Sequence, residues 1–159
     1  MNRRTWNLRR VSFGSTAAIV ASMGLVVGLD AATVTKEAIV ASLLLVAVAD
    51  NLTDSLSVHI YQESERLAER EAFRSTVANF LARLLVCVTF ILILVLLPTS
   101  QATQACVIWG FVLLSGLSYL LARARAVSAF SEIWKHAAVA LVVILLSKAI
   151  GAWILTIVR

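Results

Sequence analysis

The chain has 159 residues and a formal net charge of +5. Hydrophobic residues make up 60% of it, and its mean hydropathy is +0.91, whereas a soluble domain is about half apolar or slightly less. This excess lies in long runs, so the composition excludes a soluble domain and predicts an all-α integral membrane protein, because the chain lacks the alternation of a membrane barrel. The basic residues flank the apolar runs and form no nucleic-acid motif, so we expect no nucleic-acid partner.

Five segments are long and apolar enough to cross a bilayer, which takes about 20 mostly apolar residues. They cover about residues 11–29, 37–59, 76–97, 103–121 and 136–158. We expect a basic cytoplasmic arm over 1–10, followed by a single five-helix transmembrane domain over 11–159. The second helix should continue into the cytoplasm over about 60–74, because that stretch has no Gly or Pro.

Lysine and arginine residues predict the orientation of these helices. Three segments that the five spans place on one side carry most of them: Arg3, Arg4, Arg9, Arg10, Arg66, Arg70, Arg74, Arg123, Arg125 and Lys135. The opposite side has Lys36 and Arg159. The positive-inside rule therefore predicts a cytoplasmic N-terminus and an outer C-terminus. We expect a multi-pass protein in contact with the lipid bilayer of a prokaryotic inner membrane.

The second span carries acidic residues in its apolar middle, in the stretch "VAVADNLTDSLSVHIYQESE". Asp50 and Asp54 are four residues apart and share one helix face. Each costs about 2.5–3.5 kcal/mol at the centre of an inserted helix, so both should face a partner or a wet cavity. Further polar residues follow towards the cytoplasm: Asn51, Ser57, His59, Glu63, Glu65 and Glu69.

Two interpretations of these residues stay open. Oxygen ligands with an occasional imidazole suit Mn²⁺ and Fe²⁺, and the same groups could relay protons. Alternatively, the aspartates pair structurally with Arg83 or Lys148, the charged residues within other spans. The two interpretations are compatible, because a salt bridge that a substrate must break is a gate. Likewise, the glutamates after the span either collect cations or form a solvated, salt-bridged helix.

Small residues recur along the first span at Ala17, Ala21, Gly24 and Gly28, the last two forming a G-x-x-x-G motif. Such residues let two helices approach closely, between subunits or within one. We expect a dimer contact in preference to packing inside the subunit.

Catalytic motifs are missing from the sequence: it has no Walker loop, no G-x-S-x-G and no H-E-x-x-H. We therefore expect no enzyme and no tightly bound cofactor. Cys87 and Cys106 lie in apolar segments without a C-x-x-C spacing, which predicts buried thiols in place of a disulfide or a zinc site.

Three features resemble the vacuolar iron transporter family. The first span, "FGSTAAIVASMGLVVGL", is similar to the family's opening helix. The second, "ADNLTDSLSVHIYQESE", is similar to its metal-binding helix and the acidic residues after it. Five spans, Pro98 after the third and "SKAIG" near the end of the last also match.

This resemblance implies a homodimer that moves Fe²⁺ or Mn²⁺ out of the cytoplasm in exchange for protons, between the first two spans of its subunits. Asp50 falls where the family has a methionine, and Asp54 falls on the family's glutamate. The family's first-span aspartate has no counterpart at 11–13, and only residues 63–71 stand in place of its long cytoplasmic metal-binding domain. We hypothesise that Asp50 supplies the lost carboxylate. These departures also favour the alternative, a non-transporting scaffold or partner subunit with Asp50 and Asp54 in structural pairs.

Overall fold

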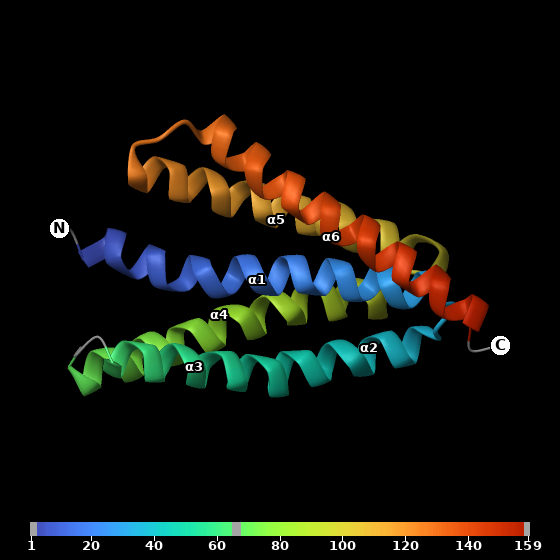
Figure 1. The fold of residues 1–159 in the computed structure, drawn as a ribbon, viewed down its shortest axis with the longest axis horizontal. Coiled ribbons are helices and arrows are strands. Elements are labelled where there is room, and N and C mark those ends of the chain that lie inside the picture. Colours follow the sequence, from blue (N-terminus) through green and yellow to red (C-terminus); the bar gives the residue numbers. More distant parts are fainter. Residues whose placement is uncertain (1–2, 65–67, 158–159) are drawn as a thin grey trace.

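A computed structural model describes the backbone of residues 3–64 and 68–157, and the side chains from residue 14 onward within those ranges. Every long element in these ranges is a helix (Figure 1). The elements are α1 (Arg3–Ala31), α2 (Lys36–Leu45), the π-helix η1 (Val46–Asp50), α3 (Asn51–Ser64), α4 (Glu69–Leu96), α5 (Thr99–Arg125) and α6 (Ala129–Ile157). Because α2, η1 and α3 form one continuous run, five helical segments are long and apolar enough to span a membrane.

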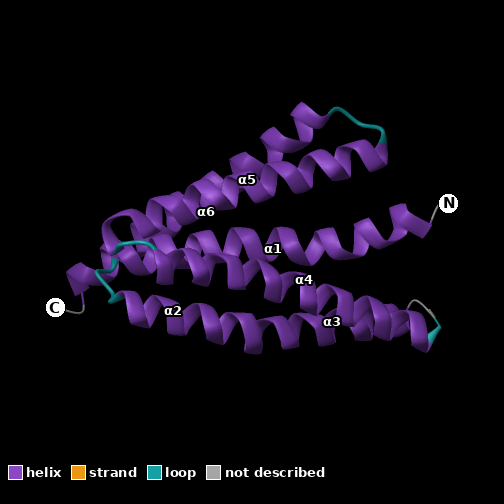
Figure 2. Ribbon diagram, turned by 180° about the vertical axis from the view of Figure 1, so that it is seen from behind, coloured by secondary structure: helices purple, strands orange, loops and turns teal. Residues whose placement is uncertain are grey.

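The first helix lies at the centre of the bundle. Helix α1 packs against α4, α5 and α6, and less extensively against α2. Figures 1 and 2 show α2, α3 and α4 on one side of α1, with α5 and α6 on the other. Half of the apolar window of α1 is buried, compared with 11% of that of α6. The core is therefore built around α1, whereas α6 presents most of its surface to the surroundings.

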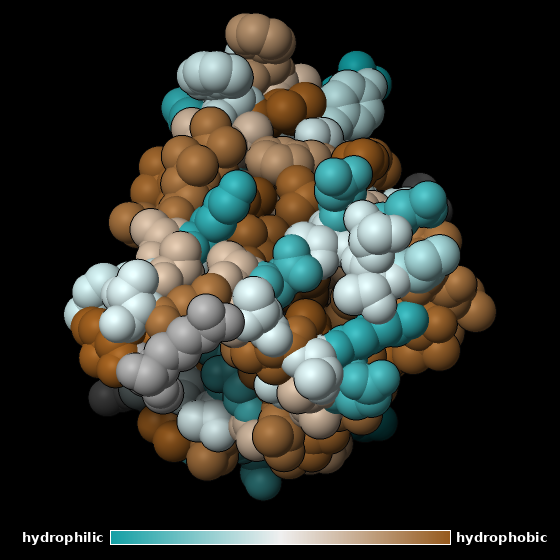
Figure 3. All heavy atoms as spheres, turned by 90° about the vertical axis from the view of Figure 1, so that its right-hand side faces the viewer, coloured by the Kyte–Doolittle hydropathy of each residue, from teal (hydrophilic) through white to brown (hydrophobic). Residues whose placement is uncertain are grey.

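Apolar side chains fill the contacts of α1 and also cover the outside of the bundle. Ile19, Met23 and Val26 of α1 are almost fully buried. Large apolar residues on the outer helices, such as Leu85 and Leu145, are more than half exposed. The space-filling view along the bundle shows hydrophilic groups on the end that faces the viewer, with apolar groups around them (Figure 3). Exposed apolar flanks suit a lipid environment, where they lose nothing by facing outward.

The chain reverses at short connections, as the apolar pattern predicts. Helix α4 ends at Leu96, and Leu97 is extended (φ −98°, ψ 152°) because the residue before a proline avoids the helical region. Pro98 then caps α5. The N-terminus and the α3–α4 and α5–α6 connections lie at one end of the bundle, and the C-terminus and the other connections lie at the opposite end (Figure 1).

Two expected boundaries differ from the structure. The segment expected as a separate arm over 1–10 is, from Arg3 onward, the beginning of α1. The second helix does not continue to residue 74: α3 ends at Ser64, and residues from Glu69 onward belong to α4, with Ala68 as the capping residue. Hydropathy locates the lipid-embedded part of a helix, but backbone hydrogen bonding continues beyond it. The reversal brings the start of α4 back against α3, where Gln62 bonds to Ser75.

Candidate functional site

A buried arginine joins the polar residues of the second span. Arg83, half-way along α4, has a side chain only 4% exposed. Its Nε donates to Asn51 Oδ1 at 2.7 Å, its Nη1 donates to Asp54 Oδ2 at 2.7 Å, and its Nη2 donates to Asp50 Oδ2 at 2.9 Å. Three acceptors from one helix therefore surround one guanidinium, and two of these contacts are ion pairs.

Helix geometry explains why these residues converge. Asp50, Asn51 and Asp54 are spaced so that they point to one side of the helix. Asp50 is the middle residue of the 29-residue run Lys36–Ser64. Arg83 belongs to a row of buried residues that recurs every three or four positions on α4, and α4 packs along α3. The cluster therefore lies near the middle of both helices, far from either end of the bundle.

The π-helix precedes this cluster directly. The backbone N–H of Asn51 bonds to the carbonyls of Val46 and Val48. The carbonyl of Ala47 receives the Asn51 side chain, whose Nδ2 donates at 2.8 Å. The Asn51 amide is thus fixed at both ends, with its nitrogen bonded to the helix and its oxygen bonded to Arg83. Such π-turns occur frequently at functional sites.

Charge and exposure are distributed unequally in the cluster. Two carboxyl groups share one guanidinium, so the cluster has one more acidic group than basic groups. The side chains of Asp50 and Asp54 are 56% and 33% exposed, although Arg83 is buried. The carboxylates therefore open to the outside of α3, where contact with hydrocarbon would be costly. They are accessible to a cation or a proton from that side.

The other residues predicted for the site lie elsewhere on α3 and α4. His59 contacts Glu63 at 3.4 Å and Thr76 at 3.3 Å, not the aspartates. The Ser57 hydroxyl is exposed and donates to the carbonyl of Thr53 in its own helix. Glu63 and Glu69 are exposed near the end of the bundle, and Glu65 lies outside the described residues. Among the residues that the structure describes, no three His, Cys, Asp or Glu side chains are grouped to hold a metal ion.

The structure distinguishes between the two expected charge partners. Arg83 bonds to both aspartates. Lys148 is exposed on α6, and α6 packs against α1 and α5, not against α3. Lys148 is therefore not the partner of Asp50 or Asp54 within one subunit.

The expectation of a dimer contact through the G-x-x-x-G motif is corrected in part. A side chain at Gly24 would meet Val143 and Ser147 of α6, and one at Gly28 would meet the backbone of Ser147. These glycines therefore allow α1 and α6 to approach within one chain, as small residues do in membrane bundles. Ala17 and Ala21 are exposed on α1.

Comparison with known proteins adds no relative. No protein-family model matches the chain, no curated protein matches it, and no solved structure matches it. Function is therefore inferred from the residues of the site and from the sequence resemblance.

Sequence reasoning missed two residues beside the cluster, Asn79 and Gly14. Asn79 is buried, as is Ser55 on the polar face of the second span, at 2% and 4% exposed. Gly14 of α1 lies against Asn79, because a side chain at Gly14 would overlap the Asn79 amide. One sequence signal could have found Asn79: it lies midway between Ser75 and Arg83 in a polar row with a spacing of four residues, and this row is a buried face of α4.

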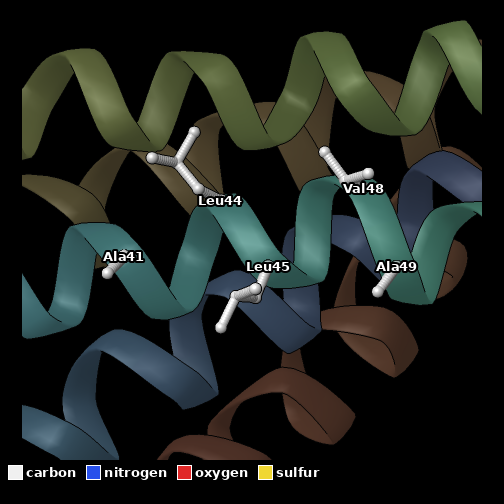
Figure 4. Close-up of a pocket in the computed structure, with 5 residues that line it drawn as sticks. All are labelled: Ala41, Leu44, Leu45, Val48 and Ala49. Carbon is white, nitrogen blue, oxygen red and sulfur yellow. The ribbon is translucent and has the colours of Figure 1, made fainter.

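An open apolar groove lies next to the cluster on the exposed side of the second helical run (Figure 4). Its lining is Ala41, Leu44, Leu45, Val48 and Ala49. The small side chains of Ala41 and Ala49 leave room between the larger ones, and Asp50 directly follows Ala49 in the chain. Its chemistry suits an apolar chain or a packed helix, and it holds no polar group that would bind an ion.

Proposed function

We propose that the protein is a transporter of divalent metal cations, Fe²⁺ or Mn²⁺, which it exports from the cytoplasm in exchange for protons. One observation carries the proposal: two mid-helix carboxylates share one buried arginine and open to the outside of α3. A purely structural pair would balance its charges and close itself off. An excess carboxylate in the membrane is expensive, and such residues mark ion and proton pathways.

Competition for the carboxylate oxygens supplies the mechanism. Metal ions bind deprotonated carboxylates, so a metal and a proton exclude each other at Asp50 and Asp54. Oxygen ligands suit Mn²⁺ and Fe²⁺. Arg83 holds both carboxylates at hydrogen-bonding distance. An arriving cation displaces the guanidinium from them, so the salt bridge acts as a gate.

The basic end of the bundle indicates the cytoplasmic side of the proposed transporter, and export from that side is what the family resemblance implies. Arg70, Arg74 and Arg123 lie near the connections at the end that also carries the N-terminus. The positive-inside rule assigns this end to the cytoplasm. Glu63 and Glu69, which are exposed at the same end, would gather cations before they reach Asp54.

A homodimer would cover the exposed carboxylate. The Asp50 side chain is 56% exposed near the middle of its helix, and Ala49 and Thr53 beside it are also exposed. Small residues favour close helix contact in membranes. A second copy packed on this face would exclude lipid from Asp50 and leave a polar path between the subunits.

The second candidate is a non-transporting scaffold or partner subunit. The geometry of Arg83 favours it, because three hydrogen bonds already fix the guanidinium. In this alternative the carboxylates never leave the arginine, and the exposed face binds another membrane protein.

Metal flux into proteoliposomes distinguishes the two candidates. The measurement uses Fe²⁺ and Mn²⁺, with and without a pH gradient, for the wild type, Asp54→Asn and the matched control Asp30→Asn. Asp30 is exposed at the far end of α1. A transporter gives flux that increases with the gradient, that Asp54→Asn abolishes and that Asp30→Asn preserves. Equal flux in the wild type and Asp54→Asn would refute the proposal.

A further inference from the structure

Polar side chains line the contact between α3 and α4 from the Arg83 cluster towards the α3–α4 connection. Three bonded pairs define the antiparallel register: Asn51 with Arg83 at 2.7 Å, His59 with Thr76 at 3.3 Å and Gln62 with Ser75 at 2.8 Å. A turn forward along α3 therefore corresponds to a turn back along α4. A hydrogen-bonded seam in the middle of a membrane bundle is costly unless its groups are satisfied.

One level of this seam lacks hydrogen bonds. Ser55 lies four residues after Asn51, and Asn79 lies four residues before Arg83, so the register puts both at the same level. Ser55 is 4% exposed and Asn79 is 2% exposed. The Ser55 hydroxyl and both atoms of the Asn79 amide have no hydrogen-bond partner among the described residues. Each unsatisfied buried group costs about 1–3 kcal/mol, so three at one level call for a ligand.

Helix α1 closes the third side of this level. A side chain at Gly14 would overlap Asn79 Oδ1, and its Cβ would lie 3.1 Å from Arg83 Cδ. The Asn79 amide therefore lies against the α1 backbone, where α1 has no side chain. From Gly14 onward, α1 carries no charged residue before Asp30. The charged and titratable groups along the seam are thus Asp50, Asp54 and Arg83 on one side of this level, and His59 with Glu63 on the other.

We propose that Ser55 and Asn79 bind a buried water molecule. The site offers a hydroxyl, an amide N–H donor and a carbonyl acceptor, and a buried water typically makes about three hydrogen bonds to such groups. The water lies about one helical turn from the Asn51–Arg83 pair and one turn from the His59–Thr76 pair, and it satisfies the unpaired groups between them.

This water has a structural role. Ser55 and Asn79 lie inside the bundle between α1, α3 and α4, so a water bonded to both joins α3 to α4 at a level where the two side chains have no hydrogen bond of their own.

A structure of the wild type that resolves ordered water tests the site itself. The expected result is a water within hydrogen-bonding distance of Ser55 Oγ and of both Asn79 amide atoms. A direct Ser55–Asn79 hydrogen bond, or a dry contact between the helices, would overturn the proposal. This outcome does not depend on transport: if the water is present and the wild type moves no metal, the transporter proposal fails and the water site stands.

Thermal unfolding in detergent tests what the water contributes. Ser55→Ala removes one partner of the water and leaves the buried Asn79 amide less well satisfied, so we expect a lower Tm. Ser42→Ala is the matched control, since its hydroxyl bonds to the Ala38 carbonyl of its own helix. Without the water, Ser55→Ala would only remove an unsatisfied hydroxyl, so a Tm at or above that of the wild type would overturn the proposal.

Discussion

Arg83 determines the state of the cluster, because it is the donor to all three acceptors. A lysine at this position would offer one ammonium in place of a planar fork with five N–H donors. The guanidinium is buried, and the carboxylates it bonds to are partly open. The arginine therefore fixes the carboxylates from inside and leaves their outer side free.

Removing Arg83 should destabilise the protein strongly. Arg83→Leu leaves two carboxylates side by side without a cation, and breaking a buried pair in this way costs about 3–5 kcal/mol. Thermal unfolding in detergent, with folded yield as a second readout, measures the loss. Arg83→Lys should fall between Arg83→Leu and the wild type.

The control for Arg83→Leu is Arg125→Leu, which breaks the exposed pair with Glu132. Exposed pairs contribute about 0–1 kcal/mol, so Arg125→Leu should unfold close to the wild type. Similar losses in both leucine variants would contradict the account of a buried cluster.

At the residue scale, the sequence alone singled out the charged residues within the spans but not which of them pair with each other. A charged residue in a lipid-embedded helix needs a partner, which singled out Asp50, Asp54, Arg83 and Lys148. The choice between Arg83 and Lys148 depends on which helices pack together. Periodicity along single helices does not contain that information. The spacing of Ser75, Asn79 and Arg83 marks one face of α4, but the level of Asn79 opposite Ser55 depends on how α3 and α4 pack.

Helix α1 illustrates how small residues organise the elements. Gly24, Gly28 and Gly151 lie where α1 and α6 approach most closely, and a side chain at Gly151 would overlap the Gly28 carbonyl. Close backbone approach provides the packing that membrane helices need in the absence of a hydrophobic driving force between them. The contact fixes α6, which is otherwise mostly exposed.

Gly151→Ala should weaken the contact between α1 and α6. The added methyl meets backbone atoms that cannot rotate away, and overpacking of this kind costs about 1–3 kcal/mol. Gly116→Ala is the matched control, because a methyl there meets nothing within 4 Å, and alanine favours a helix over glycine by up to about 1 kcal/mol. Thermal unfolding in detergent should show a lower Tm for Gly151→Ala only. A lower Tm for both would point to a general effect of alanine.

The five helical segments were predictable because a membrane span has a strong apolar signal. Their ends were less predictable, since the helices continue into polar sequence at Arg3, Thr99 and Ala129. The π-helix left no signal, because its residues Val46–Asp50 are ordinary for a helix in sequence. The break after Ser64 also contains no Gly or Pro, so local propensity favoured one long helix where the packing of α4 on α3 requires a reversal.

At the scale of the whole molecule, the connections that carry most of the basic residues lie at one end of the bundle. The N-terminus and two of the connections lie together, and the C-terminus lies opposite (Figure 1). Lysine and arginine predict that the end with the N-terminus faces the cytoplasm.

A reporter fused to the C-terminus tests that orientation. We expect a phosphatase that is active only outside the cytoplasm to be active there, and a fluorescent protein that folds only inside to be dark. The N-terminal fusions should give the opposite pair of results. A fluorescent C-terminal fusion would place the basic end outside and contradict the predicted orientation.

The central claim is that Asp50 and Asp54 bind a divalent metal in place of Arg83, and Mn²⁺ binding to the purified protein tests it most directly. The free-ion signal in electron paramagnetic resonance reports how much Mn²⁺ is bound to the wild type, to the double variant Asp50→Asn with Asp54→Asn, and to Asp30→Asn. We predict saturable binding to the wild type and to Asp30→Asn, weakened as pH falls because protons compete for the carboxylates, and lost in the double variant. Equal binding to the double variant and the wild type would contradict the account.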